Sequence, residues 1–264
     1  MDKQTVTGLV LRETAKGDND KLLTILSAEH GKLTVLGKGV RSLKNRNMVT
    51  TQPFCYATYL LTKSRSGLYY ISESELHEAF FNLRGDLCSL ALASYVCEVA
   101  ECVSVEENPD VPLLRLTLNT LYAISERKKS LEQIKGAFEL RCAAVSGFLP
   151  ELSGCACCGT GDAPMFYLDI LGGELFCPGC MTRREREDEP VEYSGEWTRP
   201  FANVSPELLP ILRHVSSCDP ARLLAFRLPP ELTREFSSVC ERYLLHQLGR
   251  GFTTLDYYKE FKKL

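Results

Sequence analysis

The chain has 264 residues, of which 44% are hydrophobic and 25% are charged, and its net charge is −3. This length and apolar content exclude a disordered chain and allow two or three modest domains with real cores. The small negative charge excludes a chain that is basic throughout, but residues 1 to 78 carry eleven Lys/Arg against eight Asp/Glu, so a basic surplus lies at the N-terminal end.

Residues 5 to 75 predict five short strands, because apolar and β-branched residues alternate there between turn residues. Five short antiparallel strands suit a small closed barrel of the oligonucleotide-binding (OB) kind, and an SH3-like barrel is the alternative. The predicted strands are Thr5–Arg12, Lys21–Ala28, Lys32–Gly37, Pro53–Lys63 and Leu68–Glu75.

A basic stretch separates the third and fourth predicted strands. Clustered cations can follow a phosphate backbone and release its counterions, so this stretch is a candidate contact with DNA or RNA. A solvated loop without a ligand is the alternative, because most short charge runs are solvated. The four cations, with no acidic residue among them, are Lys38, Arg41, Lys44 and Arg46.

Aromatic residues are frequent on the last two predicted strands. Some of them could stack on bases, as barrel faces of this class do. Alternation nevertheless places about half of them inward, so most are predicted to belong to the core. The residues are Phe54, Tyr56, Tyr59, Tyr69 and Tyr70.

From residue 76 onward the apolar period becomes helical. It predicts helices over Leu87–Val103 and Leu113–Ser125, and a third helix whose apolar face reaches Leu149 and which ends at Pro150.

Further helices are predicted near the C-terminal end. Ser205-Pro206 and Asp219-Pro220 each place a capping residue before a proline suited to a first helical turn, which predicts two short helices. A longer helix is predicted over Pro230–Leu248 and is ended by Gly249. Residues 183 to 190 mix charges and predict an exposed linker, in which acidic neighbours offset Arg183, Arg184 and Arg186.

Two Cys-x-x-Cys pairs lie about 18 residues apart and match the four-thiolate zinc pattern, because each pair turns tightly enough to aim two sulfurs at one ion. Residues 165–171 and 174–176 predict two strands joined by a two-residue turn, Gly172-Gly173, and this hairpin would bring the pairs together. The predicted ligands of one structural zinc ion are Cys155, Cys158, Cys177 and Cys180.

Other uses of these cysteines are less consistent with the sequence. The start of the chain lacks a signal-peptide layout, so disulfides are not expected, and no thioredoxin-like unit surrounds the pairs. A catalytic zinc usually has a histidine ligand, whereas the four histidines are isolated. Cys157 could replace Cys155 or Cys158, but only those two have the spacing of the second pair.

In the order barrel, helices, cysteine hairpin and helices, the whole chain resembles the RecO family of bacterial recombination mediators. The resemblance is strongest in residues 31–41 (GKLTVLGKGVR), in Gln52-Pro53-Phe54, and in the block from Phe148 to Cys180.

The resemblance implies a non-enzymatic DNA repair protein with an α+β multidomain fold: a five-stranded OB-fold barrel followed by an all-α domain with an inserted four-cysteine zinc hairpin. It implies binding to single- and double-stranded DNA, annealing of complementary strands, and work with RecR and the single-strand-binding protein to load RecA. Lys38, Arg41, Lys44 and Arg46 fall in the barrel's basic loop, and the four predicted zinc ligands match the family's ligands. The acidic balance after residue 78, with 20 Lys/Arg against 26 Asp/Glu, departs from a continuous basic surface and confines the expected DNA contact to the barrel and its neighbours.

We therefore expect a barrel over residues 1–78, helical segments over 79–150 and 183–264, and a zinc-binding hairpin over 151–182. No apolar run is long enough to span a bilayer, so a bacterial cytoplasmic, nucleoid-associated protein is expected. Two other hypotheses are a protein-interaction scaffold with incidental DNA binding, and a zinc hydrolase or deaminase, which the all-thiolate quartet disfavours.

Overall fold

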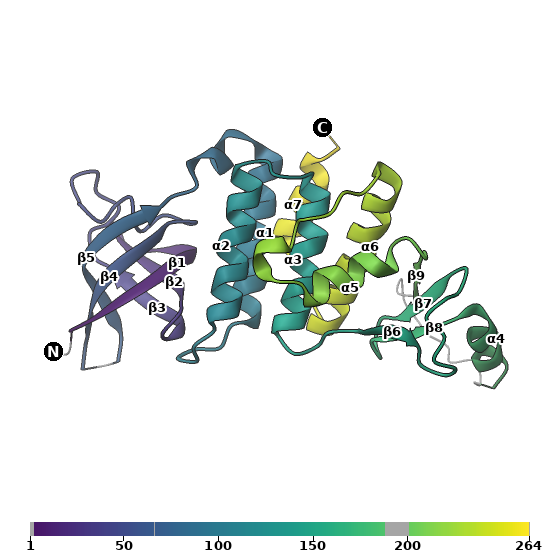
Figure 1. Ribbon diagram of the computed structural model, residues 1–264. Helices are drawn as coiled ribbons and strands as arrows, with labels where there is room; N and C mark the ends of the chain where they lie inside the picture. The colour runs from purple at the N-terminus through teal and green to yellow at the C-terminus, as the bar shows by residue number, and fades with distance from the viewer. Residues whose placement is uncertain (1–2, 66, 188–200, 264) are drawn as a thin grey trace. The chain divides into compact units, whose positions relative to one another are not determined.

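The computed structural model describes residues 3–65, 67–187 and 201–263. The chain divides into two compact units. Figure 1 colours the ribbon by residue number. Unit 1 comprises Met1–Lys128 and Phe252–Leu264, and unit 2 comprises Lys129–Gly251. The division of the chain at residues 78, 150 and 182 stays a prediction.

Unit 1 begins with the predicted five-stranded barrel. The strands pair in the order β1-β2-β3-β5-β4, and β1 also pairs with β4, which closes the barrel. The prediction of an all-antiparallel barrel is wrong at one seam, because β3 and β5 are parallel. This order is that of an OB fold rather than an SH3-like barrel. The strands are β1 (Lys3–Lys16), β2 (Asp20–Ser27), β3 (Gly31–Gly37), β4 (Tyr56–Lys63) and β5 (Tyr69–Glu78).

The barrel interior is filled by alternate side chains of its strands. Tyr59 is fully buried there, and its hydroxyl donates a hydrogen bond of 2.7 Å to the carbonyl oxygen of Thr50. The fourth strand starts at Tyr56 rather than at Pro53, because Phe54 has a left-handed backbone (φ 69°) that extended strands do not adopt. The core cluster consists of Val6, Val10, Leu23, Ile25, Leu33, Val35, Ala57, Tyr59, Leu61 and Tyr69.

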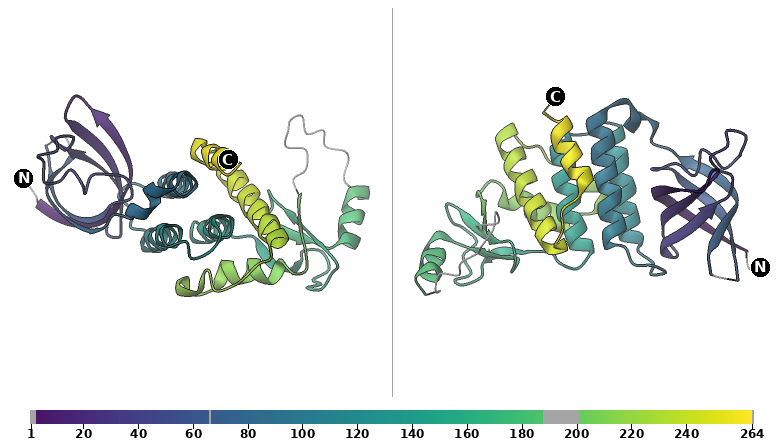
Figure 2. Two further views of the ribbon diagram at one scale, coloured as in Figure 1. Left: turned by 90° about the horizontal axis from the view of Figure 1, so that it is seen from above. Right: turned by 180° about the vertical axis from the view of Figure 1, so that it is seen from behind.

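Three helices and a 3-10 turn complete unit 1. Aspartates cap the first two helices, since Asp86 accepts from Ser89 N and Asp110 from Leu113 N. Helix α7 packs on α1, where Thr254 Oγ1 donates to Glu98 Oε2 at 2.6 Å, and the sequence did not predict this helix. The right view of Figure 2 shows α7 beside α1. The elements are η1 (Phe81–Gly85), α1 (Leu87–Val103), α2 (Val111–Ser125) and α7 (Thr253–Phe261).

The helices of unit 2 are α3 (Leu131–Val145), α5 (Leu209–Ser217) and α6 (Pro230–Leu248), besides α4 described below. Helix α6 confirms its prediction and ends at Gly249 (φ 62°). The predicted end of α3 at Pro150 is wrong, because Gly147 (φ 88°) leaves the helical path and Phe148 N closes back on Ala143 O.

The two short helices predicted before α6 are also only partly confirmed. The chain turns at residues 206–208 before α5 begins at Leu209, so the helix starts later than Ser205-Pro206 indicates. Asp219 does cap the next segment, since its carboxylate accepts from Ala221 N, but that segment is only the 3-10 turn η2 (Pro220–Arg222).

The predicted exposed linker over residues 183–190 is wrong in its first part. Residues 183–187 of that segment belong to helix α4 (Pro178–Glu187). The first helical turn forms where Cys177 O accepts from Met181 N. Residues 188–190 of that prediction lie outside the described residues. Among the helices that the structure describes, none has the length and apolarity required to cross a membrane.

A buried ion cluster joins α3 to α6 in unit 2. Lys135 Nζ lies 3.0 Å from both carboxylate oxygens of Glu139 and 2.9 Å from Glu241 Oε2. Burial lowers the pKa of Lys135, but the two carboxylates raise it by more, so the net shift is upward. The lysine is therefore charged at neutral pH, and the stability that its charge contributes is lost as the pH rises through this elevated pKa.

We expect the substitution Lys135→Met to lower the free energy of unfolding by about 3–5 kcal/mol, because it leaves two carboxylates facing each other without the buried ammonium between them. Urea denaturation measures this change. Arg234→Met, which removes an exposed cation of α6, is the control and should cost less than about 0.5 kcal/mol. Equal effects of the two substitutions would contradict a structural role for the cluster.

Candidate metal centre and nucleic-acid interface

Four cysteine thiols meet at one point in unit 2. The Sγ atoms of Cys155, Cys158, Cys177 and Cys180 all lie within 4.8 Å of one another. Cys155 and Cys180 are buried, whereas Cys158 is exposed, so the cluster lies at the edge of its sheet. These are the four cysteines that the spacing selects.

A small sheet positions the two Cys-x-x-Cys pairs. Its strands are β6 (Glu151–Cys155), β7 (Phe166–Asp169), β8 (Glu174–Phe176) and β9 (Phe201–Val204), in the order β6-β8-β7-β9. Strand β6 runs parallel to β8, and Ala156 N donates to Leu175 O at 2.7 Å. Each of these two strands leads directly into one cysteine pair, so their pairing places the pairs side by side.

The predicted hairpin is confirmed, but its two-residue turn is wrong. Tyr167 pairs with Phe176 and Leu168 with Leu175, which leaves residues 170–173 as the loop. Asp169 causes the longer loop, because its Oδ1 accepts from the backbone N–H groups of Leu171 and Gly172 and thereby ends the strand. Strand β9, which the sequence did not predict, pairs with β7 on its other side.

The backbone around the first pair supports a thiolate. Cys177 N lies 3.4 Å from Cys155 Sγ, in position to donate to it. Burial raises the pKa of Cys155, but the backbone N–H groups of Cys177, Cys158 and Cys157 lower it by more, to about 6. A thiol with this pKa is largely deprotonated at neutral pH, which is the form that binds metal.

The donor set fits a tetrahedral zinc ion. Sulfurs at about 2.3 Å from a tetrahedral zinc are about 3.8 Å from one another. Cys158 Sγ and Cys177 Sγ are 3.8 Å apart, which matches this spacing. The four sulfurs would hold the ion and leave no position for water, so the chemistry that such a site supplies is structural.

Three cysteines in helices are explained by apolar packing, without a metal. Cys97, Cys142 and Cys240 are buried in helices, and burial raises the pKa of Cys97 and Cys240. Cys157 is exposed and does not belong to the group of four thiols.

The basic stretch lies between β3 and β4 of unit 1. We call residues 38–46 the basic loop; its four cationic side chains are all exposed. Two hydrogen bonds hold the loop. Within it, Asn45 Nδ2 donates to Lys38 O, and Asp20 Oδ1 of β2 accepts from Gly39 N. A loop with this support presents its cations from a defined backbone.

The cations of the basic loop differ in their neighbours. Lys38 Nζ lies 4.7 Å from the centre of the Tyr70 ring, and Arg41 donates to Gly17 O at 3.1 Å. Arg46 forms an ion pair with Glu73, at 3.2 Å, between two exposed side chains. Exposed pairs of this kind are weak, so Arg46 can exchange Glu73 for a phosphate at little cost.

Of the five aromatic residues predicted on the last strands, Phe54, Tyr59 and Tyr69 are buried, although Phe54 precedes β4. Tyr56 and Tyr70 are only half-buried. Alternation along β5 predicts that Tyr69 and Tyr70 face opposite sides. The contact between Lys38 and Tyr70 could not be predicted from the sequence, because 31 residues separate these two residues.

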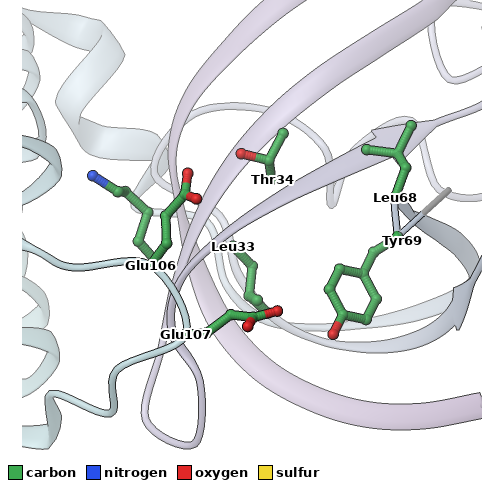
Figure 3. A pocket seen from close by; sticks show the side chains of 8 residues that line it. Leu33, Thr34, Leu68, Tyr69, Glu106 and Glu107 are labelled. Atoms are coloured by element: carbon green, nitrogen blue, oxygen red, sulfur yellow. The ribbon is translucent and has the colours of Figure 1, made fainter.

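A cavity of about 300 Å³ opens elsewhere on unit 1, between β3, β5 and the connection from α1 to α2 (Figure 3). The connection follows β3 closely, since Lys32 N donates to Val105 O. Glu106 and Glu107 line the cavity with Leu33, Thr34 and Tyr69. Lys32 also lines it and Lys63 pairs with Glu107 at 3.6 Å, so the cavity has no surplus of positive charge that would attract phosphate, and it is not part of the candidate nucleic-acid interface.

The structure thus defines a class of protein in which a closed OB-like barrel precedes a helical domain that carries a four-cysteine cluster. Residues 1–80 match the family model described as Recombination protein O N terminal, and residues 84–194 match Recombination protein O C terminal. The chain belongs to the recombination protein O family.

Relatives match along the whole chain. A DNA repair protein RecO of Desulforudis audaxviator is 31% identical over 261 residues, which cover 98% of each chain. A DNA repair protein RecO of Acetivibrio thermocellus is 27% identical over 264 residues, covering 100% of this chain and 99% of that protein. A DNA repair protein RecO of Alkaliphilus metalliredigens is 35% identical over 173 residues, covering 66% of this chain and 70% of that protein.

Proposed function

We propose that this protein is a recombination mediator of DNA repair. It binds single- and double-stranded DNA without sequence preference, anneals complementary strands, and acts with RecR to load RecA onto DNA coated by the single-strand-binding protein. Membership of the recombination protein O family supports this role. The observation that carries the DNA contact is the basic loop, whose four exposed cations project from an OB-like barrel.

Annealing requires two strands at high local concentration, with their mutual repulsion screened and their bases free. Lys38, Arg41, Lys44 and Arg46 supply the screening through phosphate contacts, which carry no sequence information and leave base edges exposed. No acid, base or nucleophile is required for this function, so the proposed protein is not an enzyme. Its site of action is the bacterial nucleoid.

The role of the four-cysteine cluster in this proposal is structural. One zinc ion bound by Cys155, Cys158, Cys177 and Cys180 holds the sheet of β6 to β9. Because structural zinc binding is coupled to folding, the ion stabilises unit 2 and does not take part in a reaction.

The direct test is annealing of complementary oligonucleotides at physiological salt, each coated with a cognate single-strand-binding protein. We expect this protein to accelerate duplex formation severalfold, because its cations screen the repulsion between strands. Quenching between dyes on the two strands measures the rate, and the same reaction without this protein is the reference. No acceleration, together with no binding to bare DNA in the same buffer, would favour a protein-interaction scaffold instead.

A further inference from the structure

Unit 1 exposes two aromatic rings on neighbouring elements outside the barrel. Phe81 of η1 is 62% exposed and Tyr122 of α2 is 50% exposed. The two elements pack against each other, and Asn82 Nδ2 of η1 donates to Glu126 Oε1, at the end of α2, at 3.3 Å. Figure 1 shows η1 near the end of α2. We call Phe81, Arg84, Tyr122, Arg127 and Lys128 the Phe81–Tyr122 surface.

A cation accompanies each exposed ring. The guanidinium carbon of Arg84 lies 5.7 Å from the centre of the Phe81 ring, and Lys128 Nζ lies 5.3 Å from the centre of the Tyr122 ring. A third cation, Arg127, directly precedes Lys128 in the chain and is exposed. Three carboxylates lie near these three cations, those of Glu78, Asp86 and Glu126, so the surface has no net charge and its cations act beside the individual rings.

The backbone holds this arrangement in a specific conformation. Phe80 (φ 44°), just before η1, and Arg127 (φ 48°), just after α2, have left-handed backbones, and Lys128 N closes back on Ala123 O to end α2. Glu78 Oε1 accepts from the N–H groups of Ala79 and Phe80 and so stabilises the turn that exposes Phe81. Arg84 is fixed as well, because it donates to Ala79 O and Pro53 O.

The surface is also connected to the basic loop. Pro53, whose carbonyl accepts from Arg84 Nη2, lies in the segment that runs from the basic loop to β4. The Arg84 guanidinium carbon also lies 5.8 Å from the centre of the Phe54 ring. Arg84 therefore ties the surface to the segment that follows the basic loop in the chain.

The chemistry of this surface suits a single nucleic-acid strand. Exposed rings stack on bases of any sequence, and neighbouring cations contact the phosphates. An acidic apolar peptide would instead need a deep apolar pocket for its anchor residue. Binding of such a peptide is the competing outcome, and the measurements below distinguish it from binding of a nucleic-acid strand.

We propose that the Phe81–Tyr122 surface binds single-stranded nucleic acid by base stacking, as a second strand site distinct from the basic loop. This inference rests on the proposed annealing function, because annealing needs two strands on one protein at once. The loop holds one strand by its phosphates, and the surface holds the other by stacking on one or two of its bases, which leaves the remaining bases free to pair.

Photocrosslinking tests the contact without measuring activity. An oligonucleotide that carries 5-iododeoxyuridine is irradiated with the full-length protein, and the crosslinked peptide is identified by mass spectrometry, because this base reacts with an aromatic ring on which it stacks. We expect crosslinks at Phe81 or Tyr122. Crosslinks that map only to the barrel, for example to Tyr70, would overturn the inference.

A double variant, F81A/Y122A, gives the matching binding measurement. We expect single-strand affinity to fall about tenfold per ring with an unchanged salt slope, because stacking releases no counterions. V105A/Y257A is the matched control, since it shortens side chains that are 59% and 51% exposed outside the surface, and it should bind as the wild type does. Unchanged circular dichroism establishes that both variants fold.

The outcomes separate this inference from the proposed function. If F81A/Y122A binds and anneals like the wild type, the second strand site is wrong while the mediator function stands. If the wild type neither binds nor anneals DNA, the proposed function fails first. If a fluorescent acidic apolar peptide loses affinity in F81A/Y122A while oligonucleotide binding is unchanged, the surface belongs to a peptide partner and the inference is overturned.

Discussion

Removal of zinc from the four-cysteine cluster should unfold the sheet of β6 to β9 and destabilise unit 2. The strands of this sheet have only three to five residues, so their own pairing supplies little stability. Structural zinc contributes about 10–16 kcal/mol of apparent binding free energy in small zinc modules, and this energy is folding energy. We expect one zinc per chain by elemental analysis, and rapid proteolysis within residues 151–182 after chelation.

Single substitutions sharpen this experiment. Cys158→Ser or Cys177→Ser should lower the zinc content well below one per chain, because each removes one of four ligands. Cys157→Ser is the matched control, since it changes an exposed thiol in the same turn and should keep the full zinc content. Purified protein that contains iron and sulfide, or that resists chelation and proteolysis without any metal, would contradict the zinc assignment.

Charge reversal in the basic loop should have the largest effect on DNA binding. If all four cations contact phosphates of a single strand, they contribute about −3 to the log–log salt slope, from −0.7 for each contact. The variant with Lys38, Arg41, Lys44 and Arg46 changed to Glu should therefore lose about 100- to 1,000-fold in affinity near 0.1 M salt. Fluorescence anisotropy of a labelled oligonucleotide across a salt series measures both quantities.

A variant with the same change in net charge is the control for this result. Four exposed cations outside the loop, changed to Glu together, shift the charge of the chain equally but should leave the salt slope near its wild-type value. These are Arg115, Arg227, Arg234 and Lys263. Equal losses in the two variants would mean that overall charge, not the basic loop, determines binding.

Elements with a strong local signal were predictable from the sequence. Helices α1 and α6 match their predicted bounds, because a continuous apolar period and a terminal cap or glycine define both ends. The barrel was predictable for a related reason, since its strands alternate between buried and exposed residues.

Elements that depend on distant partners were not predictable. Strand β9 has four residues and exists because β7 offers it an edge. Helix α7 has nine residues, and its Leu255 and Tyr258 are buried in a helix that packs against the distant α1. Isolated helices of this length are marginal in water, so local propensity carries little information about them.

The candidate sites also differ in whether local sequence or distant contacts determine them. The cysteine spacing alone predicted which four thiols lie together, because each pair is local and sulfur chemistry restricts the choice. The neighbours of the cations were not readable from the chain, since Lys38 meets Tyr70 and Arg46 meets Glu73 only through barrel closure. Phe81 and Tyr122 likewise lie on neighbouring elements only because η1 packs against α2.

The position of α7 has a consequence for how the chain folds during its synthesis. Unit 2 is continuous in sequence, whereas unit 1 is interrupted by it and is completed only by residues 252–264. On the ribosome, the face of α1 that carries Tyr95 and Glu98 cannot be covered until Phe252 and Thr254 have emerged, after all of unit 2. The barrel and the inserted unit can each fold earlier, because domains fold as units during translation. A nascent chain that stalls before α7 therefore exposes an apolar helix face, which makes it a target for chaperones even though its barrel is already formed.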